Sequence, residues 1–174
     1  MATGRDTKLT GATGEYLVAA ELCRLGLVAA PFAGNVPHYD VIASDPRGGH
    51  LAVQVKTIRG STWQFNVQSF LEATFDGKKQ VLGRVRREPY PRLACVLVVL
   101  RDGEPGSADR FFVLPWRKLR GIVVRGYRRY LTKHGHVRPR SPGSFHTAVR
   151  ISEVAAYESR WELICKRVGK VASR

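Results

Sequence analysis

Two short apolar segments with polar residues at alternating positions constrain this chain most strongly. The first, residues 39–43, contains Asp40, and the second, residues 51–57, contains Gln54 and Lys56 two positions apart. The short connection between them is rich in turn formers, so the two segments are predicted to form an antiparallel hairpin. Because successive side chains of a strand point to opposite faces, Gln54 and Lys56 project from one face, where Asp40 can join them. The sequence therefore predicts an acid, an amide oxygen and a cation at a single point.

These residues resemble the active-site signature of the PD-(D/E)xK nuclease superfamily. On that resemblance Asp40 is the acid that binds a divalent metal, Lys56 orients or activates the attacking water, and Gln54 takes the place of a second acid. The chain departs from the pattern at Tyr39, where the family usually has Pro, and at Gln54, although some homing endonucleases are similar in carrying Gln there. The implied activity is hydrolysis of DNA phosphodiester bonds with Mg²⁺, or Mn²⁺ as a substitute. The Gln54 amide and the Val55 carbonyl are the further ligands of that hypothesis.

The segment from Leu9 to Leu25 is predicted to be an amphipathic helix that ends at Gly26. At about 100° per residue its apolar stripe comprises Tyr16, Val18, Ala19, Leu22, Cys23 and Leu25. Glu15 lies in the middle of that stripe, and a buried acid is costly unless something pairs with it. One interpretation leaves Glu15 in the solvated first turn, where the helix dipole favours an anion. The interpretation we favour is that Glu15 completes the metal site, because the segment is similar to the first helix of archaeal Holliday-junction resolvases.

The charge of the chain favours a polyanionic partner, most commonly nucleic acid. The resemblance to nucleases implies that this nucleic acid is DNA. The formal net charge is +15 over 174 residues, and residues 61–174 hold 23 Lys or Arg against nine acids. The basic residues expected to contact nucleic acid are Lys78, Lys79, Arg84, Arg86 and Arg87, followed by Arg117, Lys118, Arg120, Arg125, Arg128, Arg129 and Lys133. The alternative is a merely basic protein from an organism that favours Arg.

The order of the elements predicts an α/β protein with a restriction endonuclease-like core: a mixed central sheet, flanking helices and a basic C-terminal extension. The later elements are a strand buried on both faces at 93–100, a surface turn at 101–109, a strand at 110–114, a helix at 116–130, an edge strand at 145–151 and a last helix that starts at Ser152. We expect a single domain over 1–174, in which the core with the active-site hairpin spans 1–115 and the basic portion 116–174 packs on it.

The apolar segments and the cysteines of the sequence bear on the expected location and partners of the protein. No segment approaches the roughly 20 apolar residues that span a bilayer, so no membrane partner is expected. Cys23, Cys95 and Cys165 are far apart and have no zinc-ligand spacing. We expect them to be buried free thiols in a reducing cytoplasm.

Three functions are compatible with these observations. The first is a metal-dependent DNA endonuclease for restriction, homing, repair or junction resolution, for which a homodimer would supply two-strand cleavage. The second is a catalytically inactive nucleic-acid-binding module of the same fold, in which Gln54 marks a lost active site. The third is a basic structural protein of a nucleoprotein particle.

Overall fold

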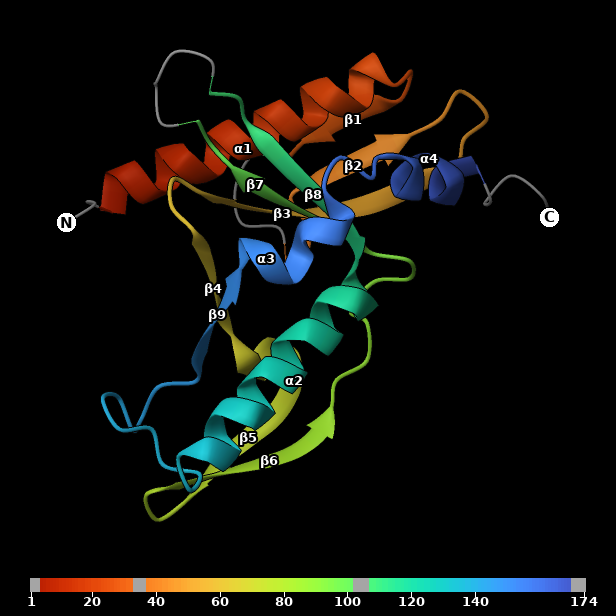
Figure 1. Cartoon of the computed structure of the whole chain (residues 1–174). Coiled ribbons are helices and arrows are strands. Elements are labelled where there is room, and N and C mark those ends of the chain that lie inside the picture. The colour runs from red at the N-terminus through yellow and green to blue at the C-terminus, as the bar shows by residue number, and fades with distance from the viewer. Residues whose placement is uncertain (1–3, 33–36, 102–106, 170–174) are drawn as a thin grey trace.

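A five-stranded sheet lies at the centre of the protein. The computed structural model describes residues 4–32, 37–101 and 107–169 (Figure 1). The sheet has the order β1-β2-β3-β7-β8, formed by β1 (Val28–Pro31), β2 (Val41–Ser44), β3 (His50–Ile58), β7 (Ala94–Val99) and β8 (Arg110–Pro115). The pair β3–β7 is parallel and the other neighbours are antiparallel. The predicted α/β class with a mixed central sheet is therefore confirmed.

Helices cover both faces of this sheet, because its strands are apolar on both sides. Helices α1 (Gly4–Arg24) and α4 (Glu162–Val168) cover one face, where Leu22 and Ile164 pack on Val53 and Val96. Helix α2 (Trp116–Lys133) packs on the other face through a separate apolar cluster. Five of the six β7 residues are buried, as predicted for a strand covered on both faces.

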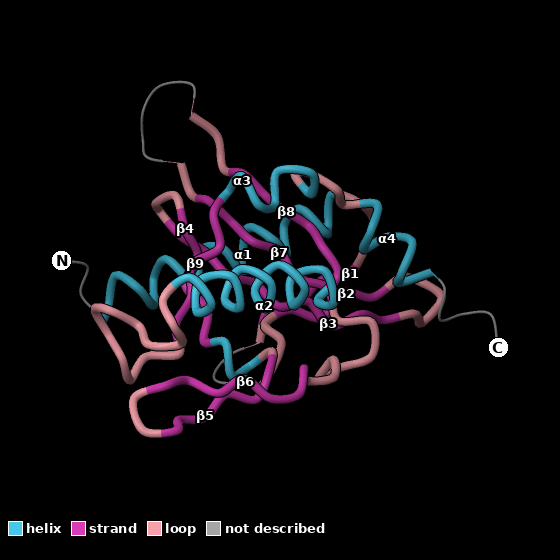
Figure 2. The backbone as a smooth tube through the Cα atoms, turned by 60° about the horizontal axis from the view of Figure 1, so that its bottom comes forward, coloured by secondary structure: helices cyan, strands magenta, loops and turns pink. Residues whose placement is uncertain are grey.

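A second layer extends below the central sheet and faces its active-site side. It consists of two antiparallel pairs, β4 (Thr62–Asn66) with β9 (His146–Arg150) and β5 (Leu71–Asp76) with β6 (Lys79–Val85). A 3₁₀ turn, η1 (Val67–Ser69), joins β4 to β5. Helix α2 lies along this layer (Figure 2), and the buried Gln80 of β6 accepts a hydrogen bond from the Tyr127 hydroxyl of α2. Residues 62–85 thus belong to this second layer and do not extend the central sheet.

The first helix differs from its prediction in length and in the residues it buries. It begins at Gly4, five residues before the predicted start, and Gly26 adopts the left-handed conformation expected just after its end. Tyr16 and Leu25 are 68% and 45% exposed, and Cys23 is exposed as well, so these three side chains do not belong to the buried stripe. The buried stripe consists of Gly14, Val18, Ala19 and Leu22. It is narrow because, in the described part of the chain, α1 packs mainly on β1, β2 and β3 of the central sheet.

The C-terminal region also departs from the predicted single helix. It forms α3 (Ile151–Val154), the 3₁₀ turn η2 (Ala155–Tyr157) and α4. The interruption has a local cause: Ser159 adopts a left-handed φ of 52°, and its N–H donates to the carbonyl of Phe111 on β8 at 2.8 Å. The predicted strands at 93–100, 110–114 and 145–151 and the helix from Trp116 are present. Most of the predicted 101–109 turn lies outside the described residues, and among the described helices none combines the length and apolarity needed to cross a bilayer.

The contact between α1 and β3 depends on the absence of a side chain at Gly14. A Cβ added there would lie 1.8 Å from Thr57 Oγ1, whereas one added at Gly11 would have no neighbour within 4 Å. We expect Gly14→Ala to destabilise the protein by about 1–3 kcal/mol through overpacking. Gly11→Ala should instead stabilise it by about 0.5–1 kcal/mol, because Ala favours the helix. Urea denaturation measures both changes, and equal effects would contradict the proposed contact.

Candidate active site

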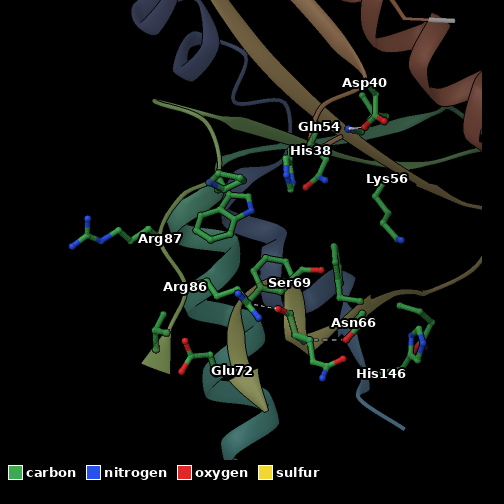
Figure 3. Close-up of a pocket in the computed structure, with 18 of the residues that line it drawn as sticks. His38, Asp40, Gln54, Lys56, Asn66, Ser69, Glu72, Arg86, Arg87 and His146 are labelled. Carbon is green, nitrogen blue, oxygen red and sulfur yellow. Dashed lines mark hydrogen bonds between the residues drawn. The ribbon is translucent and has the colours of Figure 1, made fainter. Parts of the chain in front are cut away.

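The β2–β3 hairpin brings the predicted catalytic residues together. Val41 pairs with Val53, so Asp40 stands opposite Gln54, and the Asp40 N–H donates to the Val53 carbonyl at 2.9 Å. The Val55 N–H donates to Asp40 Oδ2 at 2.7 Å and fixes the carboxylate against β3. Gln54 and Lys56 alternate with the buried residues of β3, so all three polar side chains line the same cleft (Figure 3).

The cleft separates the central sheet from the second layer and has a volume of about 930 Å³. One wall is the hairpin, and the facing wall comes from η1, β5, β6 and the segment after β6. Polar residues of the cleft that the sequence analysis did not single out include His38 beside the hairpin and Asn66, Ser69, Glu72 and His146 on the other side. Asn66 and His146 reach the site through the pairing of β4 with β9, and local sequence patterns do not predict such a long-range contact.

The protein environment disfavours the ionisation of both carboxyl groups near the site. Burial raises the pKa of Asp40 above its ordinary value, although the Val55 N–H and the Lys56 ammonium act in the opposite direction. Burial also raises the pKa of the half-buried Glu15 on α1, and the negative charge of Asp40 raises it further. Glu15 therefore lies within electrostatic reach of Asp40, although it does not line the cleft. The metal-free site holds negative charge at a free-energy cost that a cation would offset.

Lys56 is held between an acid and an aromatic ring. Its Nζ lies 5.4 Å from the centroid of the Phe65 ring, a cation–π distance. Desolvation by the surrounding protein lowers the pKa of Lys56, and the Asp40 carboxylate opposes this change. The side chain remains exposed to the cleft, so its ammonium group can reach a ligand there.

Gln54 has a weaker set of contacts. It pairs in register with Cys95 of β7, and the Cys95 Sγ lies 3.9 Å from Gln54 Oε1. Because a thiol is a weak donor, this contact leaves the amide oxygen available to a ligand in the cleft. Burial raises the pKa of the Cys95 thiol, so the sulfur stays protonated and brings no charge to the site.

The oxygen donors of the site are of the type that a hard cation prefers, but together they carry little negative charge. Mg²⁺ prefers oxygen ligands and retains several waters. Asp40 and Glu15 supply carboxylates, and Gln54 and Val55 supply neutral oxygens. Within the described part of the chain no three His, Cys, Asp or Glu residues gather as a metal site. The predicted ligand set therefore stays a prediction, supported by the raised carboxyl pKa values.

The predicted basic residues divide between the cleft and the outer surface. Arg84, Arg86 and Arg87 line the cleft, whereas Lys78 and Lys79 lie at the exposed turn of the β5–β6 hairpin. On α2 the exposed basic residues are Arg117, Lys118, Arg125, Arg128, Arg129 and Lys133. Arg120 has a structural contact, because it donates to the Arg86 carbonyl at 2.8 Å. All three cysteines are free, but only Cys95 is buried: Cys23 is exposed and Cys165 is partly buried, which corrects the expectation that all three are buried.

Stability should depend on pH through Asp40. Because its pKa is raised, Asp40 stabilises the metal-free fold fully below the ordinary carboxyl pKa, and this contribution is lost as the pH rises through the raised value. Asn cannot ionise and can still accept from Val55, so we expect metal-free Asp40→Asn to be more stable than wild type at pH 7. The difference should shrink as the pH falls toward 4. Chemical denaturation with EDTA measures it, with the exposed Asp76→Asn as the control for one lost charge; an Asp40 variant less stable at pH 7 would overturn the argument.

No family model matches the chain, and no curated protein matches its sequence. Among solved structures it is similar to the bacterial homing endonuclease I-Ssp6803I, with 18% identity and a TM-score of 0.53 over 97% of this chain and 98% of the other. It also matches Hjc, a Holliday junction resolvase from the archaeal hyperthermophile Archaeoglobus fulgidus, with 15% identity and a TM-score of 0.43 over 84% and 88% of the two chains. The homing endonuclease confirms the resemblance at the level of the fold. The chain therefore shares its fold with this homing endonuclease, in agreement with the restriction endonuclease-like core expected from the sequence.

Proposed function

We propose that the protein is a metal-dependent endonuclease that hydrolyses phosphodiester bonds of DNA in the cleft beside β3. The observation that carries this proposal is the convergence of Asp40, Gln54 and Lys56 on one face of the hairpin. The facing wall of the same cleft carries Arg84 and Arg86. A phosphodiester between these walls meets cations on the far side and metal-binding oxygens on the near side. The fold shared with a homing endonuclease supports DNA as the substrate class.

Each residue has a distinct task in this mechanism. A bound Mg²⁺ or Mn²⁺ would act as a Lewis acid and lower the pKa of a bound water. Asp40 and Glu15, with the Gln54 amide and the Val55 carbonyl, would hold it. The Val55 N–H keeps Asp40 Oδ2 in place, so Oδ1 would be the oxygen of this carboxylate that binds the metal. Lys56 orients the attacking water and stabilises the negative charge that develops on the phosphoryl oxygens.

The exposed basic residues extend the binding surface beyond the cleft. Six Lys or Arg side chains of α2 are exposed, and no acid occurs between Arg117 and Arg140. Such a surface binds phosphates of duplex DNA without sequence preference and makes the affinity depend on salt. Cleavage of both strands by one site per chain calls for a second copy, so a homodimer on DNA is part of the proposal. The three free cysteines agree with a reducing cytoplasm as its location.

A second candidate function is a nucleic-acid-binding module without catalysis. One observation favours it: Gln54 leaves two carboxylates near the site where the related pattern with a helix Glu has three. A divalent metal would then bind too weakly for hydrolysis, while the arginines of the cleft would still bind the DNA backbone.

Cleavage of a DNA panel separates the two candidates. The substrates are supercoiled plasmid, linear duplex, single strand and four-way junction, each with Mg²⁺, Mn²⁺ or EDTA. We expect metal-dependent cutting by wild type and a loss of at least about 10²-fold in Lys56→Ala. Lys8→Ala, which removes an exposed lysine of α1 that neither lines the cleft nor belongs to the predicted binding residues, should cut at the wild-type rate. Tight binding without cutting would support the inactive module, and equal cutting by Lys56→Ala would refute the assigned site.

Gln54→Glu should strengthen metal binding. The added carboxylate raises the charge of the ligand set, which is a main determinant of affinity for hard cations. We expect the Mg²⁺ affinity to rise by about tenfold or more. The corresponding free energy is only a modest part of the Coulomb energy between the ion and one additional negative charge nearby. Gln64→Glu is the matched control, because Gln64 lines the same cleft from β4, away from the hairpin. Isothermal titration measures both variants, and equal affinities in wild type and Gln54→Glu would show that position 54 is not a ligand.

A further inference from the structure

The antiparallel ribbon of β5 and β6 presents one exposed face that is continuous with the cleft. The ribbon extends from the cleft away from the central sheet (Figure 1). Cross-strand pairing places Thr74 opposite Val81 and Asp76 opposite Lys79, so these four exposed side chains share one face. Glu72, two residues before Thr74 on β5, continues the same face and lines the cleft. We call Thr74, Asp76, Lys79 and Val81 the ribbon face.

The opposite face of the ribbon is fixed to the rest of the protein through Gln80. This side chain is buried, accepts a hydrogen bond from the Tyr127 hydroxyl of α2, and donates to two carbonyls of residues 142–144 at 2.9 and 3.1 Å. Because Lys79 and Val81 alternate with Gln80 along β6, they point to the other side of the ribbon. The contacts of Gln80 therefore hold the ribbon face outward, toward solvent.

The ribbon face combines four kinds of side chain, which is unusual for a surface that binds phosphates alone. A phosphate-binding surface is expected to be basic, as in the segment after β6 that carries Arg86 and Arg87. The ribbon face instead includes the acid Asp76, which a DNA backbone repels, and Val81, an apolar side chain that is 48% exposed. In the described part of the chain neither Asp76 nor Lys79 forms an ion pair, so both charged groups remain available to a ligand.

The edges of DNA bases in the major groove match this mixture. Lysine donates to O6 and N7 of guanine, a carboxylate accepts from N4 of cytosine, and Thr or an apolar side chain contacts the methyl group of thymine. The acid and the valine, which have no function on a phosphate surface, thus have partners among the bases. The ribbon face therefore fits base edges better than the phosphate backbone.

The dimensions of the ribbon agree with the same ligand. The major groove is about 12 Å wide and admits a two-stranded β-ribbon, whereas the minor groove is only about 6 Å wide. Two residues along a strand span about 7 Å. The pair of Thr74 with Val81 therefore lies about two base pairs from the pair of Asp76 with Lys79, because the rise of the duplex is about 3.4 Å per base pair.

We propose that the ribbon face reads base edges in the major groove of a DNA duplex whose backbone passes through the cleft. Lys79 contacts a guanine, and Thr74 with Val81 contacts the methyl group of a thymine about two base pairs away. The choice of DNA as the ligand rests on the proposed function. The inference adds that binding is sequence-specific and names the side chains that determine the preference.

The first experiment selects bound duplexes from a library with a randomised segment, using the full chain and EDTA. We expect wild type to enrich a guanine and a thymine about two base pairs apart. Lys79→Ala should lose the preference for guanine alone, and Val81→Ala the preference for thymine alone. Arg87→Ala, which removes an exposed cation of the cleft, is the matched control and should bind every sequence more weakly with the same preferences. No enriched sequence in wild type, or one consensus for all variants, overturns the proposal.

A conservative variant separates the methyl contact from an effect on the strand. Val81→Thr keeps a branched side chain and one methyl group, so it should retain most of the preference for thymine that Val81→Ala loses. Thermal melting of each variant checks that the fold is unchanged. An equal loss of preference in both variants, at equal Tm, contradicts the methyl contact.

The second experiment identifies the groove with modified bases in the selected duplex. Replacing the guanine with 7-deazaguanine removes an acceptor of the major groove, and replacing it with inosine removes the amino group of the minor groove. We expect 7-deazaguanine to weaken wild-type binding by about tenfold and to leave Lys79→Ala unaffected, whereas inosine should change neither. Sensitivity to inosine alone, or equally tight binding of a single strand, overturns the proposal.

Both experiments measure binding without metal, so their results are independent of cleavage. A protein that selects this sequence but cuts no DNA would refute the proposed nuclease and keep the ribbon face as a reader of sequence. A protein that cuts DNA but selects no sequence would refute the role of the ribbon face and keep the nuclease.

Discussion

The alternation of side chains along β3 determines both the core and the site. Leu51 and Val53 point to the face that α1 and α4 cover, whereas Gln54 and Lys56 belong to the facing side, in register with β7. A shift of the β2–β3 register by one residue would move every one of these side chains to the opposite face. Because the apolar core under α1 fixes this register, it also fixes the polar residues in the cleft. The Asp40–Val55 hydrogen bond stabilises the same register. Packing and chemistry are two consequences of one strand pairing.

The cleft beside β3 holds ionisable groups away from water. Asp40 and Glu15 are desolvated acids with raised pKa values, so the metal-free protein resists their ionisation. Lys56 is a desolvated cation whose pKa burial lowers, and the Asp40 carboxylate opposes that change. Perturbed pKa values of this kind are typical of functional sites, so the electrostatics and the strand geometry favour the same place for the proposed reaction.

The parts predicted from sequence are those with a local signal. The period of two around Gln54 and Lys56, with turn formers before them, predicted the hairpin and its shared face. The continuous apolar run at 93–100 predicted a buried strand in the same way. Helical periodicity predicted too wide a buried stripe for α1. The pattern shows that Tyr16 and Leu25 are apolar, but it cannot show that these side chains stay exposed in the fold. The facing wall of the cleft depends on contacts between residues far apart in the chain, such as the pairing of β4 with β9, and so does the contact of Arg167 with the Arg92 carbonyl. Propensity and spacing contain no information on such contacts.

The environment of Gln54 gives a physical reason for an amide where the related pattern has an acid. Its Oε1 lies beside the thiol of Cys95, which burial keeps neutral, and across the hairpin from Asp40. A third carboxylate in this place would face two acids that already resist ionisation, and its weak thiol partner could not neutralise it. The amide avoids that repulsion in the metal-free protein, but it offers a bound metal ion one negative charge fewer than a carboxylate would. If the proposed metal binds here, position 54 sets a balance between the stability of the metal-free site and its affinity for metal, and the Lys56 ammonium favours the ionised form of Asp40 in both cases.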